Sequence, residues 1–96
     1  MNQSGNVAAR LRAKLESAFA PVALDVEDES ARHAGHAGAR PGGETHFRVR
    51  IVSSAFAGVT RVERQRKVYQ ALADEITGGV HALAVTTLTP EEAGRP

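Results

Sequence analysis

The chain has 96 residues, no cysteine, and a formal net charge of +1 from twelve basic and eleven acidic side chains. This length supports one compact domain with a modest core. We therefore expect a single domain over residues 1–96, with its core at about 4–90 and a tail at 91–96. The lack of cysteine excludes disulfides and any metal site built from this chain's own thiolates, and the balanced charge gives no general attraction to nucleic acid.

The sequence contains no apolar run long enough to cross a bilayer. Its first residues, MNQSGNVAAR, lack the apolar region of a signal peptide. We therefore expect a cytoplasmic protein.

The first expected element is an amphipathic helix at about residues 4–19, which Pro21 ends. Its apolar positions recur at helical spacing and are Val7, Ala8, Leu11, Leu15, Ala18 and Phe19. A sheet or another helix must cover this stripe.

Two strands are expected next, in PVALDVEDES (21–30) and HFRVRIV (46–52). Both alternate apolar and polar residues, a pattern typical of half-buried antiparallel strands. The first strand places Val22, Leu24 and Val26 on its covered face. The opposite face is acidic in the first strand and basic in the second, so cross-strand pairs help to fix the register.

A long connection, SARHAGHAGARPGGE (30–44), joins these strands and contains His33 and His36. Most connections in compact domains have about 4–6 residues. Long ordered loops often carry function, while an inert, solvated loop is the alternative interpretation.

A capping box formed by Thr60 and Glu63 predicts a second helix, which the glycine pair at 78–79 ends. The expected apolar face of this helix consists of Val62, Tyr69, Leu72, Ala73 and Ile76. HALAVTT (81–87) predicts a third strand, and a second capping box at Thr89 and Glu92 predicts a short terminal helical turn.

The predicted fold is α+β, in the order helix-strand-strand-helix-strand, with helices packed on one face of a three-stranded mixed sheet. The second helix makes a crossover, so the second and third strands are parallel and begin at the same edge. This brings His33, His36 and His46 toward His81. Imidazole is a common metal ligand, so these histidines are candidate ligands. Structural alternatives remain for each: His81 could be a hydrogen-bonded cap of the sheet, and His46 could belong to its outer face. His33 and His36 could be solvated loop residues.

The segments VALDVEDES, ETHFRVRIVSSAFAG and GGVHALAVTTLTP, with the Arg-rich beginning of the second helix, resemble the BolA family in order over about residues 7–90. The resemblance implies a fold similar to the class II KH domain. It also implies a monothiol glutaredoxin partner, with which a BolA-like protein shares a bridging 2Fe–2S cluster.

The resemblance also implies the ligands of that cluster. His81 occupies the position of the family's characteristic histidine, within V-H-A-L. His33 best matches the second ligand, which comes from the loop between the first two strands, and His36 is the reserve candidate. Glutaredoxin and glutathione would supply the sulfur, so we expect no cofactor in the isolated chain, which we expect to be monomeric.

The alternative function is that of a DNA-binding transcriptional regulator, because some BolA-like proteins act in this way. Four cations stand at the beginning of the second helix, where they oppose the helix dipole: Arg61, Arg64, Arg66 and Lys67. The family often has a histidine at the position of Gln65, so a role for that histidine does not transfer to this chain. We expect no enzymatic activity, because the sequence contains no nucleophile and base in a recognisable context.

Overall fold

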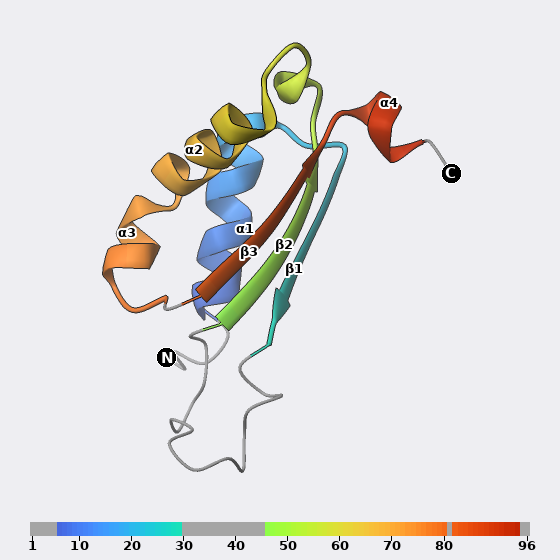
Figure 1. The fold of residues 1–96 in the computed structure, drawn as a ribbon. Helices are drawn as coiled ribbons and strands as arrows, with labels where there is room; N and C mark the ends of the chain where they lie inside the picture. Colours follow the sequence, from blue (N-terminus) through green and yellow to red (C-terminus); the bar gives the residue numbers. More distant parts are fainter. Residues whose placement is uncertain (1–5, 30–45, 81, 95–96) are drawn as a thin grey trace.

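The computed structural model describes residues 6–29, 46–80 and 82–94. Its elements, in chain order, are α1 (Asn6–Phe19), β1 (Ala23–Asp28), β2 (His46–Val52), the 3-10 turn η2 (Ser54–Phe56), α2 (Arg61–Ala71), α3 (Ala73–Thr77), β3 (Ala82–Leu88) and α4 (Pro90–Ala93). The helices α1, α2 and α3 lie on one face of the sheet, and α4 lies beyond the end of β3 (Figure 1). The predicted α+β arrangement is confirmed.

The sheet has the order β1-β2-β3, with β1 antiparallel and β3 parallel to β2. The register places Asp25 opposite Arg50 and Glu27 opposite Arg48, so the acidic and basic strand faces adjoin as predicted. Both β2 and β3 begin at the same end of the sheet, because they are parallel. The other end leads into η2 and α4 (Figure 1).

The core lies between the covered face of the sheet and the apolar sides of the helices. Its fully buried side chains come from both layers and include Leu11, Leu15, Phe47, Val49, Ile51, Phe56, Val68 and Leu72. The alternation of β2 explains its share, because every second residue faces the helices. The opposite face of the sheet exposes Arg48 and Arg50.

The covered stripe of β1 is shorter than predicted. Val22 lies before β1, where the chain turns from α1 into the sheet, and it is 71% exposed. Leu24 and Val26 are partly buried against the core. Val22 is therefore not covered by the helices as Leu24 and Val26 are.

The predicted second helix is divided in two at Leu72, whose φ of −105° and ψ of 16° interrupt the helical backbone. The Thr60 side chain caps α2 at Glu63 N, as predicted. Gly79 ends α3 with a φ of 136°, a conformation that favours glycine.

The apolar face predicted for α2 needs correction. Its buried positions are Arg64, Val68 and Leu72, which follow one another at a spacing of four residues. Val62, at about 200° from Arg64 around the helix, is 62% exposed. The pattern of apolar residues failed here because a charged residue occupies part of the buried stripe.

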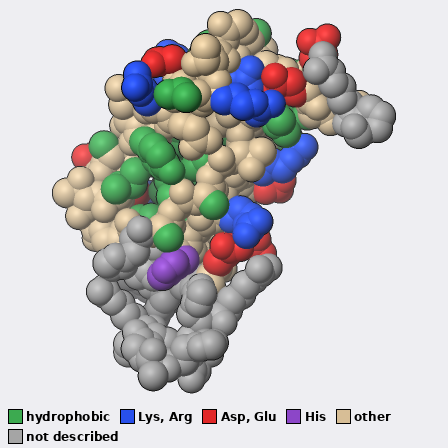
Figure 2. All heavy atoms as spheres, in the orientation of Figure 1, with side chains coloured by type: hydrophobic (Ala, Val, Ile, Leu, Met, Phe, Trp, Pro, Cys, Tyr) green, Lys and Arg blue, Asp and Glu red, His purple; other side chains and the backbone are tan. Residues whose placement is uncertain are grey.

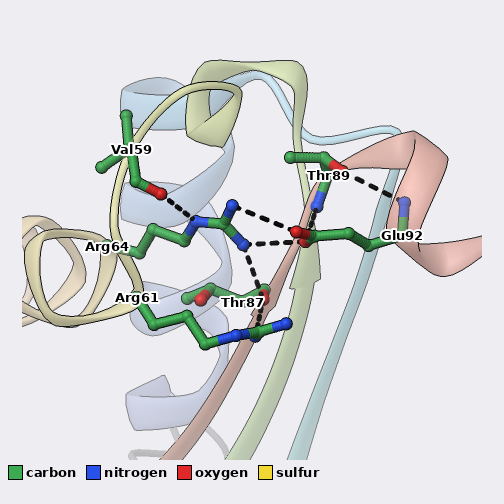
Figure 3. A network of polar contacts seen from close by, with 6 residues as sticks. All are labelled: Val59, Arg61, Arg64, Thr87, Thr89 and Glu92. Carbon is green, nitrogen blue, oxygen red and sulfur yellow. Dashed lines mark hydrogen bonds and ion pairs between the residues drawn. The ribbon is translucent and has the colours of Figure 1, made fainter.

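That charged residue joins α2 to the C-terminal helix (Figure 3). Arg64 donates to Val59 O (2.8 Å), to Thr87 O (3.4 Å) and to both carboxylate oxygens of Glu92 (2.8 and 3.2 Å). Glu92 also accepts from Thr89 N, and Thr89 Oγ1 accepts from Glu92 N, which completes the predicted capping box of α4. We call this group of five residues the Arg64 network.

Among the described residues, no helix is both long enough and apolar enough to cross a membrane.

Candidate metal centre and partner surface

The end of the sheet where β2 and β3 begin is the predicted location of the ligands. His46 opens β2, lies opposite Ala82 of β3, and accepts a hydrogen bond at its carbonyl from Glu29 N (2.8 Å). Both residues that bound segment 30–45 therefore lie at this end, together with the beginning of β3. His33, His36 and His81 themselves fall outside the described residues, so their ligation remains a prediction.

The backbone on both sides of position 81 is firmly held. Before it, Val80 N donates to Glu75 O (3.2 Å) and Gly79 N to Ile76 O (3.4 Å), the pattern of a Schellman motif. The Val80 side chain enters the core. After it, Ala82 pairs with β2. Position 81 is thus a single residue between two anchored neighbours.

Helix α3, which precedes position 81, is held to α1 by ion pairs. The Glu75 side chain is only 4% exposed and pairs with Lys14 Nζ (3.0 Å) and Arg10 Nε (3.6 Å) of α1. The hydrogen bond to the Glu75 carboxylate raises the pKa of Lys14 above its ordinary 10.5; desolvation, the second-largest effect, opposes this rise, and Asp74 adds a smaller contribution to it. These ion pairs hold α3, and with it the approach to position 81, against α1.

A cluster with thiolate ligands could not be held by this chain alone, because the chain has no cysteine. Fe–S clusters are normally held by cysteine thiolates, which histidine replaces in part in some centres. The sequence supplies four histidines and no cysteine. Within residues 6–29, 46–80 and 82–94, no three His, Asp or Glu side chains are grouped to hold a metal. A cluster bound here would need its thiolates from another molecule.

The predicted basic surface on α2 loses one of its four members. Arg64 is 6% exposed and its guanidinium belongs to the Arg64 network, so it is unavailable to phosphate. Arg61, Arg66 and Lys67 are exposed. Of these, Arg61 donates to Thr87 O (3.4 Å) and Arg66 pairs with Glu63 (2.8 Å). The cationic surface is therefore smaller and more neutralised than the sequence indicates.

Side chains one turn apart on α2 bond to alternate carbonyl oxygens along the outer edge of β3. The pairs are Arg61 with Thr87 (3.4 Å), Gln65 with Val85 (2.8 Å) and Tyr69 with Leu83 (3.0 Å). We call these contacts the α2 ladder. An edge strand is open to pairing with another chain unless something covers it, and the ladder covers this edge. The sequence signal, three donors at a spacing of four residues, was overlooked.

A groove of about 350 Å³ lies beyond the last rung of the ladder, lined by Tyr69, Ile76, Val80 and Leu83. Figure 2 shows apolar side chains gathered over α3, the adjacent part of α2 and the beginning of β3. Tyr69 and Ile76 are 40% and 36% exposed. The apolar pattern predicts both residues on the core face of a helix, so this groove differs from the prediction.

The fold and the site define a small α+β protein whose candidate metal-ligating residue, His81, directly precedes a parallel strand in the sequence. A family model described as BolA-like protein matches residues 15–92, and the chain belongs to this family. It is 48% identical over 88 residues to BolA-like protein 1 of Homo sapiens, covering 92% of this chain and 61% of the relative. It is 46% identical over 83 residues to the DNA-binding transcriptional regulator BolA of Escherichia coli strain K12, covering 86% and 75%.

Solved structures show the same fold. The BolA domain of SufE1 from Arabidopsis thaliana has a TM-score of 0.80 at 49% identity, covering 92% of this chain and 96% of that one. BolA1 from the same plant gives 0.80 at 47%, covering 93% and 95%. Among curated relatives, the chain spans 25% of SufE-like protein 1 and 56% of Protein BOLA1, both from Arabidopsis thaliana.

Proposed function

We propose that this protein is a non-enzymatic partner of monothiol glutaredoxin that co-ligates a bridging 2Fe–2S cluster, in cluster trafficking or iron-linked regulation. The observation that carries the proposal is that Val80 and Ala82, the two sequence neighbours of His81, are both anchored in the fold. A histidine stands there between two anchored residues, in a chain that has no thiolate of its own. Membership of the BolA-like family supports it.

His81 would supply a neutral imidazole nitrogen to one iron, and His33, or His36 in its place, a second. The partner and its glutathione would supply the sulfur ligands. The residues on either side of His81 are held by the Schellman motif and by pairing with β2, and anchored neighbours favour a ligand position that is organised before binding. Histidine in place of thiolate generally raises the reduction potential of a cluster.

Anaerobic reconstitution tests this proposal. The protein is mixed with its cognate glutaredoxin, glutathione, iron and sulfide, and visible absorption and circular dichroism are recorded beside glutaredoxin alone. We expect altered spectra and a heterodimer on size-exclusion chromatography. Unchanged spectra with no heterodimer would contradict the proposal.

The second candidate function is DNA binding, favoured by the 46% identity to a relative named as a DNA-binding transcriptional regulator. The exposed cations available for it are Arg61, Arg66 and Lys67. Replacing all three by glutamine should weaken DNA binding and flatten its salt dependence, because fewer counterions are released. Arg48→Gln, on the open face of the sheet, is the matched control. Equal affinity of the triple variant and the wild type at several salt concentrations would exclude this helix.

A further inference from the structure

The groove beyond the α2 ladder results from the break between α2 and α3. As far as Tyr69, α2 runs along β3 and bonds to its edge. After Leu72 the backbone changes direction, and α3 is held to α1 by the ion pair of Glu75 with Lys14. Helix α3 therefore does not continue along β3 as α2 does, and Ile76 is left at the surface.

The chemistry of the groove is apolar. Three of its four lining residues are aliphatic, and the single hydroxyl, on Tyr69, already donates to Leu83 O. It therefore offers little to a phosphate or any other charged ligand, and most to hydrophobic side chains. Val62 is more exposed than Ile76, but it does not line this groove, so it provides a natural comparison.

The groove adjoins position 81. Val80 and Leu83 both line it, and only residues 81 and 82 separate them in the chain. A molecule that brings thiolates to a cluster ligated at position 81 must lie over these residues. A specific protein interface buries about 800 Å² on each partner, so its footprint extends well beyond a single ligand.

We infer that this groove is the docking site for apolar side chains of the thiolate-bearing partner, beside the cysteine that it contributes to the cluster. The inference rests on the proposed function. Hydrophobic contacts here would hold the two proteins together before the cluster is complete, because they do not depend on iron. The groove thus provides affinity, and the histidine provides ligation.

The test measures binding of the cognate monothiol glutaredoxin in its apo form by isothermal titration calorimetry. Ile76→Glu introduces a charge into the groove and should weaken binding at least about tenfold, as expected for an apolar contact at the centre of an interface. Val62→Glu places the same charge on an exposed apolar position outside the groove and should leave affinity within about twofold.

Ile76→Ala accompanies these variants because it removes apolar surface without adding charge, and it should weaken binding by about threefold to tenfold. Thermal melts confirm that each variant is folded. If the wild type binds and Ile76→Glu and Ile76→Ala bind equally well, the groove is not the docking site, while the proposed function stands. If the wild type itself neither binds nor forms a cluster, both fail. Loss of self-association in Ile76→Glu, with unchanged glutaredoxin affinity, would instead make the groove an interface between copies of this chain and overturn the inference.

Discussion

At the end of the sheet where β3 leads into α4, polar side chains bond to one another, and the Arg64 network joins α2, β3 and α4. At the opposite end, which we call the histidine end, β2 and β3 begin beside position 81 and an apolar groove opens to solvent. The first end uses its charges within the chain. The second presents surface and a ligand position, and its described residues form no metal site. We infer that the Arg64 network stabilises the α4 end, and that the histidine end, if the proposed function holds, receives the partner.

The strongest test of this division is His81→Ala. If position 81 serves a partner, the variant should lose the mixed-ligand cluster spectrum, keep its melting temperature, and retain contact with apo glutaredoxin. His33→Ala should have a milder effect, because His36 can substitute. Melts and reconstituted spectra are compared on the same preparations.

The opposite outcome for His81→Ala has an equally clear meaning. If His81 is instead a hydrogen-bonded cap of the sheet, its removal leaves a partner unsatisfied and costs about 1–3 kcal/mol. A large loss of stability with a normal cluster spectrum would give His81 a structural role and remove the contrast between the two ends.

Arg64→Met tests the α4 end. Methionine keeps the aliphatic length but leaves Val59 O without its side-chain donor and removes the guanidinium from the Glu92 carboxylate, which keeps the Thr89 N–H. We expect a loss of about 1–3 kcal/mol, because partly buried acceptors lose a charged donor, measured by urea unfolding, with normal cluster formation at the other end. Arg61→Met, which removes one long 3.4 Å bond, is the control. Equal stability of the two variants would contradict a special role for Arg64.

These two ends also differ in how far the sequence predicts them. Strand β2 matches its predicted bounds, His46–Val52, because the alternation of apolar and basic residues from Phe47 to Ile51 leaves one arrangement that buries the apolar set. The capping box of Thr89 and Glu92 is equally local, since both partners lie within one turn. The parallel pairing of β3 followed from the crossover helix alone.

The burial of Arg64 could not be predicted from local sequence patterns. It depends on a carboxylate 28 positions away and on the carbonyls of Val59 and Thr87, which meet only in the folded chain. The break at Leu72 has a similar origin, because α3 is drawn onto α1 by Glu75 and Lys14. The groove depends on that break, so it could not be predicted from the sequence either.

Acidification should weaken the Arg64 network at the α4 end. The Arg64 guanidinium, followed by the Thr89 backbone N–H, lowers the pKa of Glu92 from its ordinary 4.5 to about 2. A carboxyl with a lowered pKa stabilises the fold fully above its ordinary value, and this contribution is lost as the pH falls toward the folded value. The advantage of wild type over Glu92→Gln should therefore be constant near neutral pH and shrink between 4.5 and about 2. A difference in urea stability that does not change across this range would contradict the pairing.

The smallest expected effect lies between the two ends, at the middle rung of the α2 ladder. Gln65 occupies the position where family members often have histidine, and its amide donates to Val85 O at 2.8 Å. Gln65→Met preserves side-chain length but removes the donor, so we expect a loss of about 0.5–1.5 kcal/mol, the net contribution of one hydrogen bond. Glutaredoxin affinity and the cluster spectrum should not change, because the groove begins one turn further along, at Tyr69. Gln65→His should restore part of the stability, since an imidazole N–H can donate to the same carbonyl. If Gln65→Met instead reduces cluster formation at unchanged stability, the middle of α2 belongs to the partner surface, and recognition extends beyond the histidine end.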